Sequence, residues 1–169
     1  MYSVHDMVLY GADGVCTITN IVSKNVLGDT RLFYELHPVN RRDAVLFLPT
    51  DNEKTMAKLR LVLTRDEILS AIRGMPGEET IWIDKESLRK ETYSRIIRSG
   101  DHRQLIRLIK TLYEHRQALT EGGRRMHAAD ENFLKEAEAV LYNEFAYVLK
   151  ISREEVLPFI QTEMEKQRA

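Results

Sequence analysis

Short apolar runs separated by turn-forming residues make up residues 1–63. The runs are rich in Val, Ile, Phe and Tyr, and some alternate apolar with polar residues, as in Val15–Thr19 (VCTIT). This period of two is typical of half-buried β-strands. Four or five strands in about 60 residues fit a small, strongly bent barrel of the SH3 or Tudor kind. The expected strands are Met7–Tyr10, Val15–Val22, Leu32–Leu36 and Ala44–Leu48.

From Thr64 onward the apolar residues recur at helical intervals. Thr64 and Glu67 have the spacing of a capping box, so a short helix is expected from here to about Gly74. A second helix is expected over about 85–99. Asp101 can cap a third helix, whose apolar stripe includes Leu105, Leu108, Ile109, Leu112 and Tyr113.

Two glycines, Gly122 and Gly123, end this third helical pattern. A long helix is expected from about Asp130, and Ser152 with Glu155 has the spacing of another capping box before a last helix. The sequence therefore predicts an α+β protein. A small N-terminal SH3/Tudor-like β barrel (1–63) is followed by a C-terminal all-α bundle of about five helices (64–169).

The net charge of −1 hides an uneven distribution along the chain. Residues 85–125 carry 11 basic and 5 acidic side chains, a net of +6, whereas residues 66–84 and 126–169 each carry a net of −4. A basic block between acidic segments suggests a localised anionic partner. A solvated helix face rich in Arg and Lys is the alternative interpretation.

No pattern in the chain predicts catalysis. There is no phosphate-binding loop or dinucleotide fingerprint, and the histidines are scattered. His127 and Asp130 lie three apart, which is better explained by a helix start capped by Asp130 than by a metal site. Cys16 is interpreted as a small core residue. We therefore expect no enzymatic activity, no catalytic residue, no metal, no cofactor and no small-molecule substrate.

The chain is also expected to be cytoplasmic and to have no membrane partner. No apolar run approaches the roughly 20 residues of a membrane helix. The N-terminus lacks the layout of a signal peptide. The lone Cys16 can form no internal disulfide, so nothing in the sequence requires an oxidising compartment.

The only tryptophan, Trp82, precedes the basic block in a short connection between two expected helices. It could be a hydrophobic anchor that packs the connection against the bundle. It could equally be an apolar wedge that presses on exposed bases while neighbouring cations bind phosphates. Lys85, Arg89 and Lys90 supply such cations one to two helical turns downstream.

Several segments, in this order and spacing, resemble the CarD/CdnL family of transcription regulators, in the version found in low-GC Gram-positive bacteria. The opening Val4–Val15 is similar to the family's "GD-x-V-x-YP-x-HGVG"-like start. Its other counterparts are Phe33–Leu36 for an aromatic "YY-x-L" strand, Leu48-Pro49 for a "VP" strand end, Leu59-Arg60 for "GLR", the Trp82 segment, the Ser99–Asp101 break and the helix from Phe133 to Leu149.

The resemblance implies a partner for each half of the chain. The family's Tudor-like domain, shared with the transcription-repair coupling factor, binds the RNA polymerase β subunit. Its helical domain contacts promoter DNA at the upstream edge of the bubble, where a tryptophan wedges into the minor groove and stabilises the open complex. Trp82 matches that wedge, and Lys24 matches a basic position used against the polymerase. A nucleoid-associated location through the polymerase follows.

The sequence departs from the family pattern at several positions. His5 replaces the usual Gly, Gly11 the usual Pro, and Phe47 stands where some relatives have an Arg that contacts the polymerase. Residues 83–85 (IDK) replace a run of arginines, so phosphate anchoring is expected at Lys85, Arg89 and Lys90. Arg124 and Arg125 fall in a segment that is longer than in shorter relatives. They are interpreted either as solvated side chains or as functional ones.

Two functional hypotheses follow. In the first, the chain binds polymerase through Lys24 and Phe47. It also binds promoter DNA, with weak sequence specificity, through Trp82, Lys85, Arg89 and Lys90. In the second, it is a protein–protein adaptor whose barrel docks on polymerase or another protein without DNA contact; the two acidic segments favour it. The steep salt dependence of phosphate contacts separates the two hypotheses.

Overall fold

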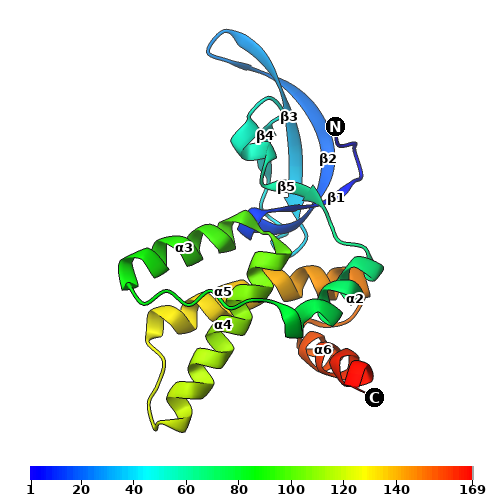
Figure 1. Ribbon diagram of the computed structural model, residues 1–169. Coiled ribbons are helices and arrows are strands. Elements are labelled where there is room, and N and C mark those ends of the chain that lie inside the picture. The colour runs from blue at the N-terminus through cyan, green and yellow to red at the C-terminus, as the bar shows by residue number, and fades with distance from the viewer. Residues whose placement is uncertain (169) are drawn as a thin grey trace. The chain divides into compact units, whose positions relative to one another are not determined.

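The computed structural model describes residues 1–168, which divide into two compact units after Val62. The first unit is an antiparallel five-stranded sheet in the order β4-β3-β2-β1-β5, in which β2 and β3 form a long hairpin (Figure 1). Its elements are β1 (Met7–Tyr10), a 3-10 turn η1 (Gly11–Asp13), β2 (Gly14–Val26), β3 (Asp29–Pro38), β4 (Leu46–Pro49), the short helix α1 (Glu53–Met56) and β5 (Leu59–Leu61).

A bulge in β2 explains how this small sheet bends around its core. One extra residue, Thr19, interrupts the pairing of β2 with β3. Because side chains alternate along a strand, the extra residue switches which positions face inward. Cys16 and Ile18 face the core before it, and Ile21 packs there after it. The buried core consists of Val8, Cys16, Ile18, Tyr34, Leu36, Leu48 and Leu59.

Cys16 is fully buried, as expected for a core residue. Burial raises the pKa of its thiol to about 12, and the nearby Asp13 carboxylate adds to the effect. The thiol therefore stays protonated and inert at neutral pH.

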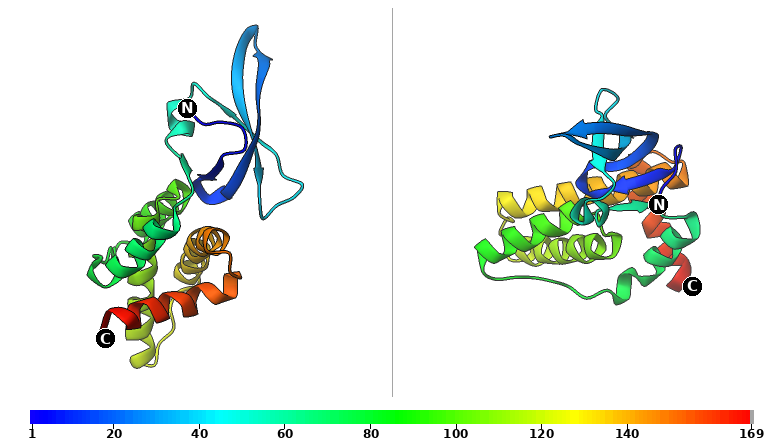
Figure 2. Two further views of the ribbon diagram at one scale, coloured as in Figure 1. Left: turned by 90° about the vertical axis from the view of Figure 1, so that its right-hand side faces the viewer. Right: turned by 90° about the horizontal axis from the view of Figure 1, so that it is seen from above.

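The second unit is helical, and its five principal helices confirm the predicted α+β class. In this unit α3, α4 and α5 pack against one another, while α6 packs on α2 and α5 (Figures 1 and 2). The elements are α2 (Arg65–Gly74), the 3-10 turn η2 (Met75–Gly77), α3 (Glu86–Ser99), α4 (His102–Glu121), α5 (Ala128–Leu149) and α6 (Arg153–Arg168).

Two predicted helix caps are confirmed. The Thr64 hydroxyl accepts from the Glu67 backbone N–H at 3.1 Å, and the Glu67 carboxylate accepts from the Thr64 backbone N–H at 3.4 Å. The Asp101 carboxylate accepts from the Gln104 backbone N–H at 3.1 Å. Each bond satisfies a donor that the first helical turn would otherwise leave unpaired.

The prediction that Asp130 caps α5 is wrong. The N-cap is His127, which makes no side-chain capping bond, and Asp130 lies inside the first turn with 1% of its surface exposed. Its carboxylate is directed to a buried arginine instead, as described below. Of the second predicted capping box, the bond from the Ser152 backbone N–H to the Glu155 carboxylate is present at 3.0 Å.

The helical unit has one continuous apolar core that spans all five of its helices. The predicted stripe of α4 is buried except for the partly exposed Tyr113, and Leu134, Ala137, Val140, Leu141 and Phe145 of α5 face the same core. No helix among residues 1–168 is long and apolar enough to cross a membrane. The same residues contain no cluster of three or more His, Cys, Asp or Glu side chains arranged for a metal ion.

Candidate functional site

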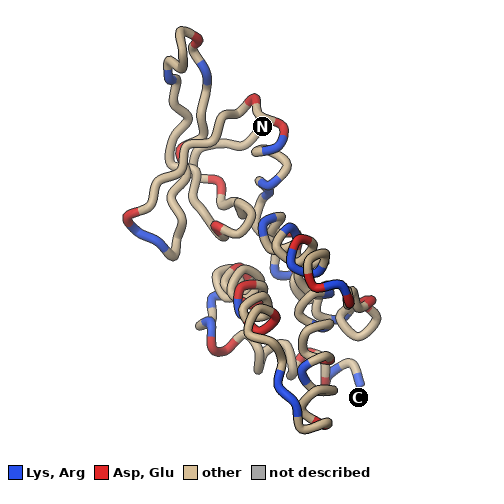
Figure 3. Tube along the Cα trace, turned by 90° about the vertical axis from the view of Figure 1, so that its left-hand side faces the viewer, with Lys and Arg blue, Asp and Glu red and all other residues tan. Residues whose placement is uncertain are grey.

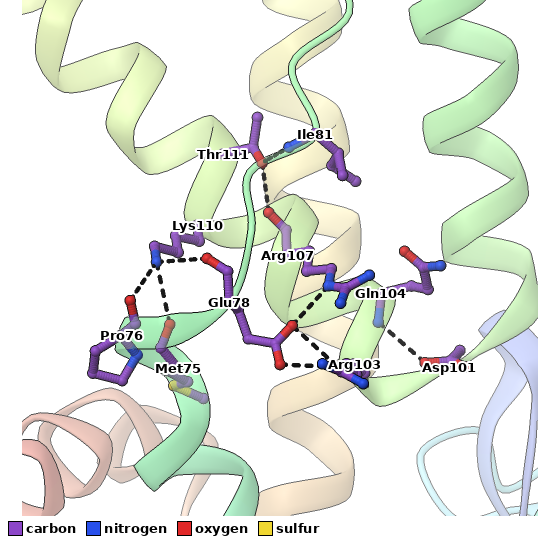
Figure 4. Close-up of polar contacts among 10 residues, drawn as sticks. All are labelled: Met75, Pro76, Glu78, Ile81, Asp101, Arg103, Gln104, Arg107, Lys110 and Thr111. Atoms are coloured by element: carbon purple, nitrogen blue, oxygen red, sulfur yellow. Dashed lines mark hydrogen bonds and ion pairs between the residues drawn. The ribbon is translucent and has the colours of Figure 1, made fainter.

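The segment of residues 78–84, here called the strap, connects η2 to α3 and carries Trp82. At its start, the Glu78 carboxylate accepts from Arg103 Nε at 2.9 Å and from Arg107 Nε at 2.7 Å, both on α4 (Figure 4). The bond from Arg107 is the largest of the effects that lower the pKa of Glu78. The start of the strap is therefore held to α4 by ionised groups.

Neutral and charged hydrogen bonds hold the rest of the strap against α3 and α4. The Thr111 hydroxyl accepts from the Ile81 backbone N–H at 2.9 Å (Figure 4), and the Tyr93 hydroxyl donates to the Ile81 carbonyl at 2.9 Å. Lys110 Nζ donates to three backbone carbonyls, those of Met75, Pro76 and Glu78, at 2.7–3.3 Å. The backbone that leads to Trp82 is thus fixed without regular secondary structure.

Trp82 is partly buried and packs against the helical core. Its ring stacks on the His115 imidazole, with ring centroids 3.7 Å apart and an interplanar angle of 20°. Its Nε1 donates to the Asp84 carboxylate at 2.9 Å, and the Arg89 guanidinium carbon lies 4.6 Å from the ring centroid. The side chain is therefore anchored as the first interpretation expected, and it retains an exposed part.

Arg89 differs from what a phosphate contact requires. Only 5% of its surface is exposed, and its Nε and Nη2 donate to the Asp130 carboxylate at 3.0 and 3.3 Å. Its Nη1 donates to the backbone carbonyls of Ile83 and Asp84 at 3.0 and 3.2 Å. Because a buried arginine needs a partner for its charge, the Asp130 carboxylate keeps the guanidinium inside the protein.

The other two predicted phosphate anchors are exposed. Lys85 is the N-cap residue of α3 and makes no capping bond. Lys90 pairs with Glu86 one helical turn earlier at 2.9 Å, with half of its side chain exposed. An exposed pair of this kind contributes little to stability, so Lys90 can exchange its partner at small cost.

Of the eleven cations in the basic block, five form ion pairs with carboxylates. Besides Arg89 and Lys90, the block's Arg95 pairs with Glu91, and Arg103 and Arg107 share Glu78. Basic and acidic positions are interspersed along the helices (Figure 3). Within residues 1–168, five other cations of the block neither pair with a carboxylate nor donate to a backbone carbonyl. They are Lys85, Arg98, Arg116, Arg124 and Arg125.

Two of these free cations lie beside Trp82. An open depression of about 460 Å³ brings Trp82 and His115 together with Arg124 and Arg125 of the α4–α5 loop. It is completed by Asp84, Glu86, Arg89, Leu119 and His127. Burial lowers the pKa of His115, and the charges of Arg89, His127 and Arg124 act in the same direction against that of Asp130. The imidazole stacked on Trp82 is therefore neutral at neutral pH.

The predicted polymerase contacts, Lys24 and Phe47, lie together in the β unit. The cross-strand pairs Lys24–Arg31, Val22–Phe33 and Phe33–Pro49 put Lys24 and Phe47 on the face opposite the core. Lys24 Nζ lies 3.2 Å from the centroid of the Phe47 ring, which is 41% exposed. No carboxylate in the described part of the chain pairs with Lys24. This face presents a cation on an exposed aromatic ring.

Comparison with protein-family models decides what the β unit is. Residues 2–60 match the family described as CarD-like/TRCF RID domain, and the match includes β1 to β4 and most of β5. The β unit is a CarD-like/TRCF RID domain. This is a non-catalytic RNA polymerase-interacting domain, so RNA polymerase is the partner that the family implies. No curated protein matches the chain.

Two departures of this RID domain from the family's opening motif have backbone correlates. His5, where the motif has Gly, adopts a φ of 77°, a left-handed conformation that glycine reaches without strain. Gly11, where the motif has Pro, has a φ of 46° that proline's ring forbids. The β1–β2 turn therefore follows a different local path from the one that the motif's proline would impose.

Sequence reasoning missed four residues around Trp82. His115 was treated as one of several scattered histidines, Asp130 as a helix cap, and Arg124 and Arg125 were left undecided. The separation of His115 and Asp130 from Trp82 along the chain gave no signal of contact. The one available hint was that the chain changes from basic to acidic after the basic block, where Asp130 lies. An acidic residue at this place is compatible with an ion pair to one of the preceding arginines.

Proposed function

We propose that the chain is a transcription regulator that binds RNA polymerase through its RID domain and promoter DNA through its helical unit. Trp82 acts as a minor-groove wedge at the upstream edge of the melted promoter. The observation that carries the proposal is the depression in which the partly exposed Trp82 meets Arg124 and Arg125. An aromatic ring beside unpaired arginines suits a base step flanked by phosphates.

Lys85 supports the same assignment. Helix N-caps favour Ser, Thr, Asp or Asn, and a cation there opposes the positive end of the helix dipole. Lys85 nevertheless occupies the N-cap of α3, three residues after Trp82, and is exposed. Stability does not explain a lysine here, whereas a phosphate contact does. We therefore assign DNA contacts to Trp82, Lys85, Lys90, Arg124 and Arg125, and remove Arg89 from this set.

Lys24 and Phe47 form the proposed polymerase contact on the outer face of the RID domain. An exposed, unpaired cation over an aromatic ring is poised for an acidic and apolar surface, here assigned to the polymerase β subunit. The polymerase partner supports a cytoplasmic, nucleoid-associated location. The long 89–130 segment supports membership of the low-GC Gram-positive type of the CarD/CdnL family.

The mechanism is a shift of population between closed and open promoter. The protein favours the open complex by the difference between its affinities for the two states. About 1–2 kcal/mol of differential binding changes the open fraction roughly 5- to 30-fold. Sequence-specific readout is not required, because the minor groove displays a degenerate pattern.

The decisive experiment measures open-complex lifetime on a promoter after a competitor is added. Trp82→Ala is expected to remove the lifetime extension while polymerase binding in a pull-down is unchanged. Trp82→Phe, which keeps an aromatic wedge, is the matched control, and thermal melts verify folding because Trp82 packs on the core. An unchanged lifetime with folded Trp82→Ala would contradict the wedge.

The salt dependence of DNA binding tests the adaptor alternative. If the helical unit contacts phosphates, the affinity for a forked promoter duplex falls linearly with salt on logarithmic axes. Binding to polymerase with no salt-dependent DNA affinity would favour the adaptor instead.

A further inference from the structure

The side chains that hold Trp82 come from α3, from α4 and from the strap itself, and they converge on its ring and its backbone. His115 of α4 covers the ring at 3.7 Å, and Arg89 of α3 lies 4.6 Å from the ring centroid. Asp84 fixes the in-plane orientation through the indole N–H. Stacking restricts tilt and the hydrogen bond restricts rotation, so together they select one orientation of the ring.

Arg89 also fixes the backbone that follows Trp82. One arm of its guanidinium donates to the carbonyls of Ile83 and Asp84, while the other two nitrogens donate to Asp130 of α5. A planar fork can make these bonds simultaneously, whereas a lysine ammonium cannot reproduce the geometry. Asp130, 1% exposed, keeps the fork oriented.

We propose that His115, Arg89 and Asp130 are positioning residues for Trp82, here called the cradle, and that they act on DNA only through the orientation of the Trp82 ring. This inference rests on the proposed role of Trp82 as a wedge. A wedge that is ordered before binding loses less conformational entropy when it enters the groove. The cradle therefore sets how effective the wedge is without contributing a phosphate contact.

The His115 variants test the cradle directly, because Trp82 is the only tryptophan and its fluorescence reports on this one ring. His115→Ala in the full chain is expected to lower the anisotropy of the indole emission. The same variant is expected to reduce the open-complex lifetime extension roughly two- to tenfold, the cost of ordering one large side chain. His115→Phe, which restores a stacking ring, should return both measurements toward wild type.

Arg89→Lys separates positioning from phosphate contact. If Arg89 contacted phosphate, Arg89→Lys would preserve the affinity for the forked duplex. If Arg89 is a positioning residue, Arg89→Lys should lower this affinity and leave the slope of its salt dependence unchanged. Lys85→Gln is the matched control, since loss of a phosphate contact lowers that slope by about one. If Arg89→Lys does not fold, the His115 variants alone decide the proposal.

Failure of the cradle is distinguishable from failure of the wedge. Equal lifetimes for wild type and Trp82→Ala would overturn the wedge and the cradle together. The cradle alone would be overturned if Trp82→Ala shortened the open-complex lifetime while His115→Ala left either the anisotropy or the lifetime unchanged. Loss of lifetime in His115→Ala that His115→Phe does not recover would also overturn positioning by stacking.

Discussion

Each unit of the protein contains a cation close to an aromatic ring, and the two pairs are built in opposite ways. In the RID domain the exposed Lys24 lies over the exposed Phe47 ring, and no carboxylate of the described chain pairs with it. In the helical unit the buried Arg89 lies beside Trp82 and is tied to Asp130. The first pair leaves its cation free for a partner, whereas the second uses four of its five N–H donors inside the protein.

If the proposed roles hold, the same contact serves recognition in one unit and positioning in the other. A lysine on an exposed ring loses little hydration and can turn toward an acidic surface. A buried arginine would be costly without its carboxylate, and its fixed fork holds the backbone around it. Burial therefore decides the role, and residue type alone does not.

The largest expected effect comes from breaking the buried pair. Asp130→Ala leaves the Arg89 guanidinium buried without its carboxylate, so the free energy of unfolding should fall by about 3–5 kcal/mol. Chemical denaturation followed by circular dichroism measures this change. Glu131→Ala, at the next and more exposed position of α5, is the matched control and should change stability by less than about 0.5 kcal/mol. Equal effects of the two variants would contradict the structural role of the pair.

A charge reversal in the exposed pair is expected to act on binding and not on folding. Lys24→Glu should weaken the pull-down of polymerase by at least about tenfold, because like charges repel at a contact built for a cation. The melting temperature should stay close to that of wild type, since Lys24 is exposed. Lys54→Glu, in the short helix of the same unit, is the control. If Lys24→Glu still retained polymerase, the proposed role of Lys24 in the contact would be contradicted.

Removing the aromatic partner should have a smaller effect. Phe47→Leu keeps an apolar side chain but abolishes the cation–π contact, which is worth about 0.5–1 kcal/mol at exposed sites. We therefore expect a two- to fivefold loss of polymerase affinity by titration. In the double variant with Lys24→Gln, the two losses should not add, because both remove the same contact. Full additivity would mean that the two residues contact the polymerase independently.

The smallest expected effect is on pH dependence. Burial depresses the pKa of His115 below its usual value, so the folded state favours the neutral imidazole. The corresponding stability is present above pH 6.5 and is lost as pH falls through the lower folded pKa. Thermal melts between neutral and mildly acidic pH should therefore decline slightly less in His115→Phe than in wild type. Identical curves would contradict a lowered pKa of His115 in the folded state.

Much of the local structure could be predicted from the sequence. The Thr64 and Asp101 caps depend on residues three apart, and the strands of the β unit depend on alternation within each run, so neighbours along the chain determine them. Strand ends were harder to place: β2 continues to Val26 beyond the predicted Val22, because its pairing with β3 extends through polar residues. Polar positions carry no periodic signal for burial.

The candidate site was predictable only in part. Trp82 is conspicuous because it is the only tryptophan and precedes a basic block, and Lys85 follows it directly. The role of Arg89 could not be read from the same stretch. Its partner Asp130 follows an intervening helix and loop, and no local rule relates the two positions.

The sequence by itself thus determined the two-part α+β architecture, the RID domain and the position of a tryptophan beside a basic block. The tertiary structure alone decided which cations of that block are free. Packing of α3, α4 and α5 buries Arg89 against Asp130 and stacks His115 on Trp82, while Arg124 and Arg125 stay exposed in the loop beside them. The physical reason is that helix propensity and capping depend on nearby residues, whereas the cost of burying a charge is met by whichever carboxylate the fold brings within hydrogen-bond distance.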